Sequence, residues 1–268
     1  KSSFGCTILS ETGDYMLKLL LCGAAGQMGA AVSDAASKET DLQIACRVDS
    51  RLPSDPAAGN FQSFSAVSVR CDCIVDFSHP SVTDDLLQYA LCTKTPVVLC
   101  TTGLSEDQIT AVQAAAKTIP VFFSANMSLG VNLLSALCQK AVRVLGGSFD
   151  IEIIEKHHNR KLDAPSGTAL LLANAMNDAA QQRYHCVYDR HSVRQKRDPL
   201  EIGIHSVRGG NIVGEHEVLF AGRDEQLSLR HTATSREVFA TGALSAARFL
   251  CNQAPGLYDM QQLISAGE

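Results

Sequence analysis

The segment LKLLLCGAAGQMG, residues 17–29, joins an apolar run of strand length to a glycine loop. Gly23, Gly26 and Gly29 stand three residues apart in this loop, and a segment of helical period, 27–38, begins inside it. A glycine loop between a strand and a helix lets the backbone approach a pyrophosphate closely and directs the N–H groups of the helix toward it. The segment therefore favours a dinucleotide-binding turn over its alternative, a tight turn that serves only close packing of strand and helix.

The same alternation of strand and helix continues from Met16 to about Pro120. LQIACRV, CDCIVDF, PVVLC and PVFFSA have the length and composition of strands, and 82–92 and 106–117 have the period of helices. Strands separated by helices predict a parallel sheet covered on both faces. The fold class is therefore α/β, with a Rossmann-type domain that binds its ligand beyond the carboxyl ends of the strands.

The pattern changes after Asn126. A helical segment, 131–144, leads into the strand-like FDIEIIEKHH, and a second helix is predicted from about Ser166 to Ala180. LEIGIHSVRGG, EHEVLFAG and EQLSLRHTA then predict three strands joined by glycine-containing turns, in an antiparallel meander. A last helix, 238–250, is expected to return to the first domain.

These patterns predict two domains. We expect a dinucleotide-binding domain over residues 16–130 and 240–268, with residues 1–15 as an extension outside the fold. Residues 131–239 are expected to form an α+β domain with a mostly antiparallel or mixed open sheet. This second domain would bind the substrate and form the oligomer.

The composition argues against several classes of protein. The chain of 268 residues has a net charge of −5, which disfavours general affinity for nucleic acid or for anionic membranes. No apolar run reaches the roughly 18 residues that span a bilayer. The ten cysteines form neither a disulfide framework nor a CxxC pair. We therefore expect reduced, mostly buried thiols in a cytoplasmic protein.

Two further strand ends carry polar residues suited to a cofactor. Asp49 ends the second predicted strand, 20 residues after Gly29, where a carboxylate can accept hydrogen bonds from an adenosine ribose. Arg51 could pair with the 2′-phosphate of NADP or lie solvated in its loop, so both NAD and NADP remain open. Thr101 and Thr102, after the fourth strand, offer hydroxyl and backbone groups to a nicotinamide; a capped turn is their alternative role.

The segment EKHHNRKLDAPSGT, residues 155–168, concentrates cationic and protonatable groups before a predicted helix start. Ser166 is suited to cap that helix, which leaves the first-turn N–H groups of Gly167 and Thr168 available to an anion. Three side chains in the preceding loop can donate protons next to such a site: His157, His158 and Lys161. Paired histidines could instead ligate a metal or lie exposed, but no third ligand has a recognisable spacing, and we predict no metal site.

Taken in order, these motifs resemble the 4-hydroxy-tetrahydrodipicolinate reductase family, also called dihydrodipicolinate reductases. The resemblance is carried by GAAGQMG, VDFSHP, the Thr-Thr-Gly turn, FSANMSLGVN, EKHHNRKLDAPSGTAL and RGGNIVGEHEVLFAG, and it extends from Met16 to the C-terminus. It implies a reductase of the diaminopimelate route to lysine that uses NADH or NADPH to reduce a cyclic unsaturated dicarboxylate. It also implies a homotetramer with contacts through the sheet of the second domain.

The resemblance also implies roles for individual residues. His157 would exchange a proton with the substrate and Lys161 would be a second proton donor. His158, Gly167 and Thr168 would hold the carboxylates of the substrate. The cofactor would be bound by Gly23, Ala24, Ala25, Gly26, Gln27, Met28, Asp49, Cys100, Thr101, Thr102, Ser124, Ala125, Asn126 and Met127.

Some positions depart from the family pattern, and two other functions fit the glycine loop. Cys100 stands where the family usually has glycine, and Ser124 and Met127 stand where it usually has alanine and phenylalanine. A semialdehyde or sugar dehydrogenase is one alternative, although the former needs an activated cysteine and the cysteines here follow apolar strands. A non-catalytic dinucleotide sensor is the other, and it would not need His157 and Lys161 beside a helix start.

Overall fold

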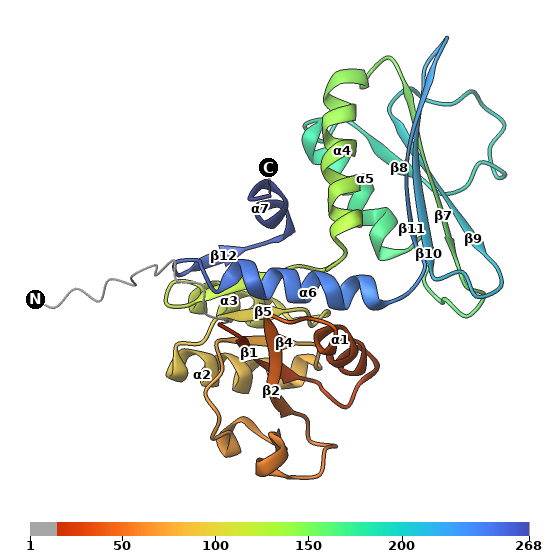
Figure 1. The fold of residues 1–268 in the computed structure, drawn as a ribbon. Coiled ribbons are helices and arrows are strands. Elements are labelled where there is room, and N and C mark those ends of the chain that lie inside the picture. Colours follow the sequence, from red (N-terminus) through yellow and green to blue (C-terminus); the bar gives the residue numbers. More distant parts are fainter. Residues whose placement is uncertain (1–14, 268) are drawn as a thin grey trace, which may run out of the picture.

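The computed structural model of the chain describes residues 15–267 and contains two β-sheets (Figure 1). The predicted extension, 1–15, lies outside the described residues except for Tyr15. Helices α4 (Leu129–Leu145) and α6 (Glu237–Leu250) follow the two places where the chain passes from one sheet to the other. The predicted fold class, a Rossmann-type sheet with a second, mixed sheet, is confirmed.

The first sheet has seven strands, and every pair in it is parallel. Two short strands at its edges, β3 and β12, were not predicted, because two or three residues carry too little periodicity. The strand order is β12-β6-β5-β4-β1-β2-β3. The bounds are β1 (Leu17–Cys22), β2 (Leu42–Val48), β3 (Asn60–Phe61), β4 (Cys73–Asp76), β5 (Val97–Leu99), β6 (Pro120–Phe123) and β12 (Gly256–Tyr258).

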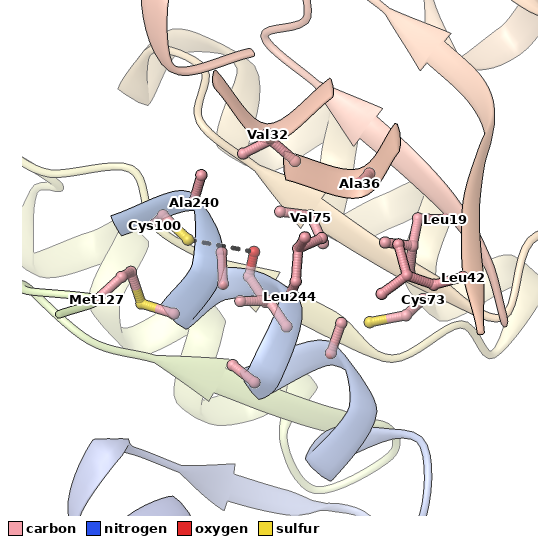
Figure 2. Packing of buried hydrophobic residues seen from close by; sticks show 14 of the residues in the cluster. Leu19, Val32, Ala36, Leu42, Cys73, Val75, Cys100, Met127, Ala240 and Leu244 are labelled. Carbon is pink, nitrogen blue, oxygen red and sulfur yellow. Dashed lines mark hydrogen bonds between the residues drawn. The ribbon is translucent and has the colours of Figure 1, made fainter. Parts of the chain in front are cut away.

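Helices cover both faces of this sheet because β1 is apolar on both sides. Leu19 and Leu21 belong to a core with α1 (Gln27–Ser37) and α6, whereas Leu20 belongs to a core with α2 (Thr83–Thr93) and α3 (Glu106–Ala115). Figure 2 shows the first of these cores, with Ala240 and Leu244 of α6 close to the side chains of the sheet. The predicted return of the last long helix to the first domain is therefore confirmed.

The second sheet has the order β11-β10-β7-β9-β8. Strand β10 pairs antiparallel with both β11 and β7, whereas β9 pairs in parallel with β7 and β8. The predicted antiparallel meander was wrong for β9, because β7 lies between β9 and β10 and takes the hydrogen bonds that a meander would form. The bounds are β7 (Asp150–His157), β8 (His185–Val187), β9 (Glu201–Arg208), β10 (Gly214–Ala221) and β11 (Gln226–Ala233).

Helices α4 and α5 (Gly167–Ala179) pack on one face of the second sheet (Figure 1). Alternate residues of β7, including Ile151 and Ile153, point into that core. The remaining elements are α7 (Met260–Ser265) and three short 3₁₀ turns, η1 (Pro56–Ala58), η2 (Phe64–Ala66) and η3 (Pro80–Val82). Within residues 15–267 no helix is long and apolar enough to cross a membrane, and all nine described cysteines are free thiols.

Candidate active site

The glycine loop combines close packing with a partly exposed segment. Gly23 has a φ of 76°, and a Cβ added there would collide with the carbonyl oxygen of Phe77. A Cβ at Gly29 would lie 2.5 Å from the carbonyl oxygen of Gly23, so both glycines allow strand and helix to approach. Ala25 and Gly26, between them, are at least partly exposed at the start of α1. The structure therefore shows the packing role directly, whereas the N–H groups of Ala25 and Gly26 are already bonded, to Asp49 at 3.0 Å and to the carbonyl oxygen of Gly23 at 3.1 Å.

Asp49 forms an ion pair at the rim of the loop. Its carboxylate accepts the backbone N–H of Ala25 at 3.0 Å and two side-chain N–H groups of Arg51 at 3.0 and 2.9 Å. These hydrogen bonds from Arg51 outweigh burial and lower the pKa of Asp49 to about 2. The side chain of Asp49 is only 6% exposed, whereas that of Arg51 is 64% exposed. Arg51 can therefore move away from Asp49 at little packing cost, while Asp49 is fixed.

A cavity of about 950 Å³ opens beside this ion pair, at the carboxyl ends of β1, β2 and β4. This volume lies within the range of small-molecule cofactor sites. The Oγ atom of Ser78 is buried at its edge with no hydrogen-bond partner among the described residues. Residues that line the cavity include Gly23, Asp49, Arg51, Phe64, Ser78, His79 and Tyr89.

The residues predicted to border a nicotinamide are not among those that line this cavity. Thr101 donates its hydroxyl to the buried carboxylate of Asp76 at 2.6 Å, and burial raises the pKa of Asp76. Thr102 is exposed. Cys100 and Met127 are buried in the core near α6 (Figure 2), which explains how this chain accepts thiol and thioether side chains at these positions. Any contact that Cys100 and Met127 make with a cofactor must use their backbone.

The loop after β6 is held by its own hydrogen bonds. The hydroxyl of Ser124 donates to the carbonyl oxygen of Asn126 at 3.0 Å, and the side-chain oxygen of Asn126 accepts the N–H of Ser128 at 2.9 Å. Ala125, between them, is exposed. The loop is therefore ordered by its polar side chains, with backbone of residues 124–126 at the surface.

The histidine segment is organised around the buried carboxylate of Glu155. Its Oε2 atom lies 2.6 Å from Nδ1 of His157, and its Oε1 accepts the N–H of Ser166 at 3.1 Å. Arg208 donates to both oxygens, at 2.8 and 2.7 Å. His157, at the end of β7, and the start of α5 are thus joined through one side chain.

His158 and Lys161 lie on the same loop in a cationic environment. Partial desolvation and the nearby charges of Arg160 and Arg236 lower the pKa of His158. Its Nδ1 atom is buried without a hydrogen-bond partner in the described part of the chain. Nζ of Lys161 lies 2.9 Å from Oδ1 of Asp163. A group of positive and proton-donating side chains therefore surrounds the loop, as an anionic ligand requires.

Helix α5 begins as predicted. Ser166 is its N-cap, and its Oγ accepts the N–H of Ala169 at 3.2 Å. The same Oγ lies 2.9 Å from Nε2 of His216, whose pKa is lowered to about 4, chiefly by burial. The first-turn N–H groups of a helix have no acceptor within the helix. With the amides of Ser166 and Ala169 occupied, those of Gly167 and Thr168 remain for an anion.

Two hydrogen bonds connect the loops predicted to bind a cofactor with the start of α5 and the residue before α6. The side-chain amide of Asn126 donates to Oγ1 of Thr168 at 3.1 Å, and Arg236 donates to Oε1 of Gln27 at 2.8 Å. Gln27 begins α1, and Arg236 is the residue before α6. The glycine loop and the loop after β6 therefore each contact residues near the histidine segment.

Several residues of the site were missed in the sequence. The strand FDIEIIEKHH alternates, and Glu155 falls on the same face as His157 and the buried isoleucines, so a charged residue on the core side was a usable signal. The other four missed residues come from distant strands and loops, and their spacing in the sequence gave no indication of them. They are Asp76, Arg208, His216 and Arg236. Within residues 15–267 no three His, Cys, Asp or Glu side chains are arranged to hold a metal ion.

Family models match both halves of the chain. The model described as dihydrodipicolinate reductase, N-terminus, matches residues 17–127, and the one described as dihydrodipicolinate reductase, C-terminus, matches residues 130–264. The two matches meet at the loop after β6, next to the start of α4.

Known proteins resemble the chain over nearly its whole length. It is 46% identical over 253 residues to a 4-hydroxy-tetrahydrodipicolinate reductase of Caldanaerobacter subterraneus subsp. tengcongensis, covering 94% of this chain and 100% of that protein. It is 43% identical over 251 residues to the protein of the same name from Clostridium tetani, covering 94% and 98%.

A solved structure shares the fold. The dipicolinate-bound dihydrodipicolinate reductase of Paenisporosarcina sp. TG-14 superimposes with a TM-score of 0.77 at 21% identity, covering 91% of this chain and 97% of that one. The family is shown by the sequence matches over both halves of the chain. The chain belongs to the dihydrodipicolinate reductases, NAD(P)H-dependent oxidoreductases of lysine biosynthesis.

Proposed function

We propose that this chain reduces 4-hydroxy-tetrahydrodipicolinate to tetrahydrodipicolinate with NADH or NADPH, and that His157 and Lys161 supply protons. The overall reaction consumes a hydride and a proton and releases water. The observation that carries the proposal is the shared contact at Glu155, which bonds Nδ1 of His157 at 2.6 Å and the N–H of Ser166 at 3.1 Å. A proton donor and an anion site are therefore neighbours, as reduction of a dicarboxylate requires.

The residues around the glycine loop fit a dinucleotide. Packing of the loop against its neighbours excludes side chains at Gly23 and Gly29. The adjacent cavity of about 950 Å³ has a buried hydroxyl, that of Ser78, without a hydrogen-bond partner among the described residues. We infer that residues 23–28 hold the pyrophosphate and that Asp49 binds the ribose. Thr101, Thr102 and residues 124–127 would border the nicotinamide. When bound, the reduced nicotinamide supplies the hydride.

The start of α5 would orient the substrate. The amides of Gly167 and Thr168 and the partial positive charge of the helix N-terminus favour a carboxylate there. His158 adds a buried ring nitrogen without a protein partner in the described region, and Lys161 adds positive charge. These groups would fix the ring of the substrate so that its reacting carbons meet the nicotinamide, and such positioning supplies a large part of the rate.

Proton delivery would follow from the same geometry. Because Glu155 occupies Nδ1 of His157, the nitrogen left for the substrate is Nε2. Lys161 is on the same loop, and its ammonium group has three protons to donate. The carbanion-like product of hydride addition would take its proton from one of these two groups, and a positioned acid contributes about 10²–10⁴ in rate.

The domain organisation and assembly follow from the family. We propose that residues 16–130 with 240–268 bind the dinucleotide and that residues 131–239 bind the substrate. We also propose a cytoplasmic homotetramer with contacts through the face of the second sheet opposite α4 and α5, where Val207 is 44% exposed. Light scattering on the purified protein tests the assembly: a tetramer supports it, and a monomer at assay concentration contradicts it.

An activity assay tests the reaction. Purified protein is mixed with NADH or NADPH and freshly made 4-hydroxy-tetrahydrodipicolinate, and loss of reduced-nicotinamide absorbance is followed. We expect turnover with this substrate and none with a semialdehyde or a sugar. Binding of the cofactor without its consumption would instead indicate a dinucleotide sensor, and turnover only with a sugar would indicate another dehydrogenase.

A further inference from the structure

Glu155 is a fully buried carboxylate surrounded by donors. It is 0% exposed and sits on the core face of β7, in line with Ile151 and Ile153. Its Oε1 accepts from the N–H of Ser166 and from Arg208, and its Oε2 accepts from Arg208 and contacts Nδ1 of His157. An ionised carboxylate has about four acceptor sites and no donor. All of them are used here.

This arrangement requires the charged form of Glu155. Burial alone would favour the neutral acid, but hydrogen bonds from Arg208 and the other donors outweigh it and lower the pKa of Glu155 to about 2. A proton on either oxygen, or an amide NH₂ in its place, would face one of the guanidinium N–H groups of Arg208. The carboxylate is therefore held as a fixed acceptor.

A fixed acceptor at Nδ1 determines which tautomer the neutral imidazole of His157 adopts. Nδ1 must carry a proton to bond Oε2, so Nε2 carries the lone pair and is the nitrogen that gains or loses a proton. Gly214 leaves space for this nitrogen, because a Cβ added there would lie 3.1 Å from Nε2. The other titratable or charged groups around His157 are His216 on β10, Arg208 on β9, and His158 and Lys161 on its own loop.

We propose that Glu155 is a positioning residue, locked by Arg208, that fixes the tautomer of His157 and ties it to the first amide of α5. Proton donor and carboxylate site would then keep a constant separation while the substrate binds. This proposal rests on the proposed function, because it assigns the task of Glu155 within that site. The reaction itself requires a proton donor, whereas this proposal also requires one particular tautomer of His157.

The variant Glu155→Gln tests this role. Either orientation of the new amide places its NH₂ group against Arg208, and one orientation also offers a donor to Nδ1, which favours the wrong tautomer. We expect kcat to fall about 10²-fold, since the contribution of a positioned acid is of this size or larger. KM for the substrate should change much less than kcat, because the amides of Gly167 and Thr168 are left in place.

Glu39→Gln is the control. Glu39 also pairs with an arginine, Arg248, at 2.6 Å, but it lies after α1, away from the second sheet. We expect its kcat and KM to match the wild type. Glu155→Asp, which keeps the charge, should restore kcat in part. An unchanged kcat in Glu155→Gln, with wild-type turnover intact, would overturn the positioning role while leaving the proposed function standing.

A measurement on the unmodified protein covers the case in which Glu155→Gln does not fold. Nitrogen-15 NMR of the histidine rings, with His157 assigned by loss of its signal in His157→Gln, reports which ring nitrogen is protonated. We expect Nδ1 to be protonated in the neutral ring. A neutral ring protonated at Nε2 would refute the proposal, whatever the activity assay gives. Absence of turnover in the wild type would refute the proposed function instead.

Discussion

Asn126 donates its side-chain amide to Oγ1 of Thr168 at 3.1 Å and so joins the two halves of the proposed active site. Asn126 belongs to the loop after β6, on the proposed nicotinamide side, and Thr168 lies in the first turn of α5. The same loop is fixed by the bond from Asn132 to the carbonyl oxygen of Asn126 at 2.8 Å. The proposed nicotinamide and substrate sites are therefore linked by a short chain of hydrogen bonds.

Replacing Asn126 with alanine should loosen this link. A hydrogen bond of this kind contributes about 0.5–1.5 kcal/mol, so kcat/KM should fall roughly 2- to 10-fold. Steady-state kinetics with the cofactor saturating measures this. Asn252→Ala, at the end of α6, is the control and should behave as wild type. If Asn126 acts through Thr168, adding the change to Thr168→Val should have little further effect, whereas additive losses would contradict the link.

Replacing His157 with glutamine should slow the chemical step. We expect kcat to fall about 10²–10⁴-fold, because a positioned proton donor is removed, while KM changes little. Cofactor binding, measured by the fluorescence of NADH, should be retained. His185→Gln, at an exposed position on β8, is the control. A decrease of kcat no greater than that of the control would remove His157 from the reaction.

Replacing Thr168 with valine should mainly weaken substrate binding. The hydroxyl bonded to Asn126 is lost, but the shape of the side chain and the backbone amide remain. We expect KM for the substrate to rise up to about 10-fold, with kcat within roughly twofold of wild type. Inhibition by pyridine-2,6-dicarboxylate gives an independent measure, since its inhibition constant should rise in parallel. An unchanged inhibition constant would place the carboxylate elsewhere.

Replacing Arg51 with alanine should change the choice between NADH and NADPH. Arg51 now pairs with Asp49 but is mostly exposed, so it is free to turn toward a 2′-phosphate. A charge-assisted bond contributes about 1.5–3 kcal/mol, so KM for NADPH should rise roughly 10- to 100-fold and KM for NADH much less. Arg223→Ala, in the exposed turn after β10, controls for net charge. An unchanged ratio of the two KM values would exclude Arg51 from phosphate binding.

His216 should make the fold sensitive to acid. Its folded pKa of about 4 lies below the ordinary 6.5, so between these values the unfolded chain binds a proton that the folded chain does not. The free energy of unfolding should therefore decrease as pH falls through this range, by about 3 kcal/mol from this group. Urea unfolding at about pH 7 and about pH 4 measures it. Between these two pH values, the free energy of unfolding should decrease less in His216→Gln than in His185→Gln. Equal decreases in the two variants would contradict a lowered pKa of His216 in the folded protein.

Much of the fold follows from local patterns in the sequence. Strand β2 occupies the predicted LQIACRV, and the N-cap of α5 is the predicted Ser166, because apolar period and capping chemistry act over a few residues. Pairing between distant segments has no such local signal. The insertion of β7 between β9 and β10 depends on contacts between residues more than forty positions apart, and the meander prediction failed there.

The residues of the candidate site were likewise predicted only in part from local sequence patterns. Residues close in the sequence, such as His157 and Lys161, were predicted together from their spacing. Arg208 and His216, which complete the surroundings of Glu155, come from two other strands and became visible only when the sheet was assembled. Cys100 and Met127 illustrate the converse, since their place in the motif suggested cofactor contact while their side chains belong to the core.

A crystal structure of the protein with NADH and pyridine-2,6-dicarboxylate tests the central claim most directly. We predict one carboxylate within hydrogen-bonding distance of the amides of Gly167 and Thr168, with Nε2 of His157 and the nicotinamide both facing the bound ring. A ligand held away from the start of α5, or a nicotinamide that does not face that ring, would contradict the proposed active site.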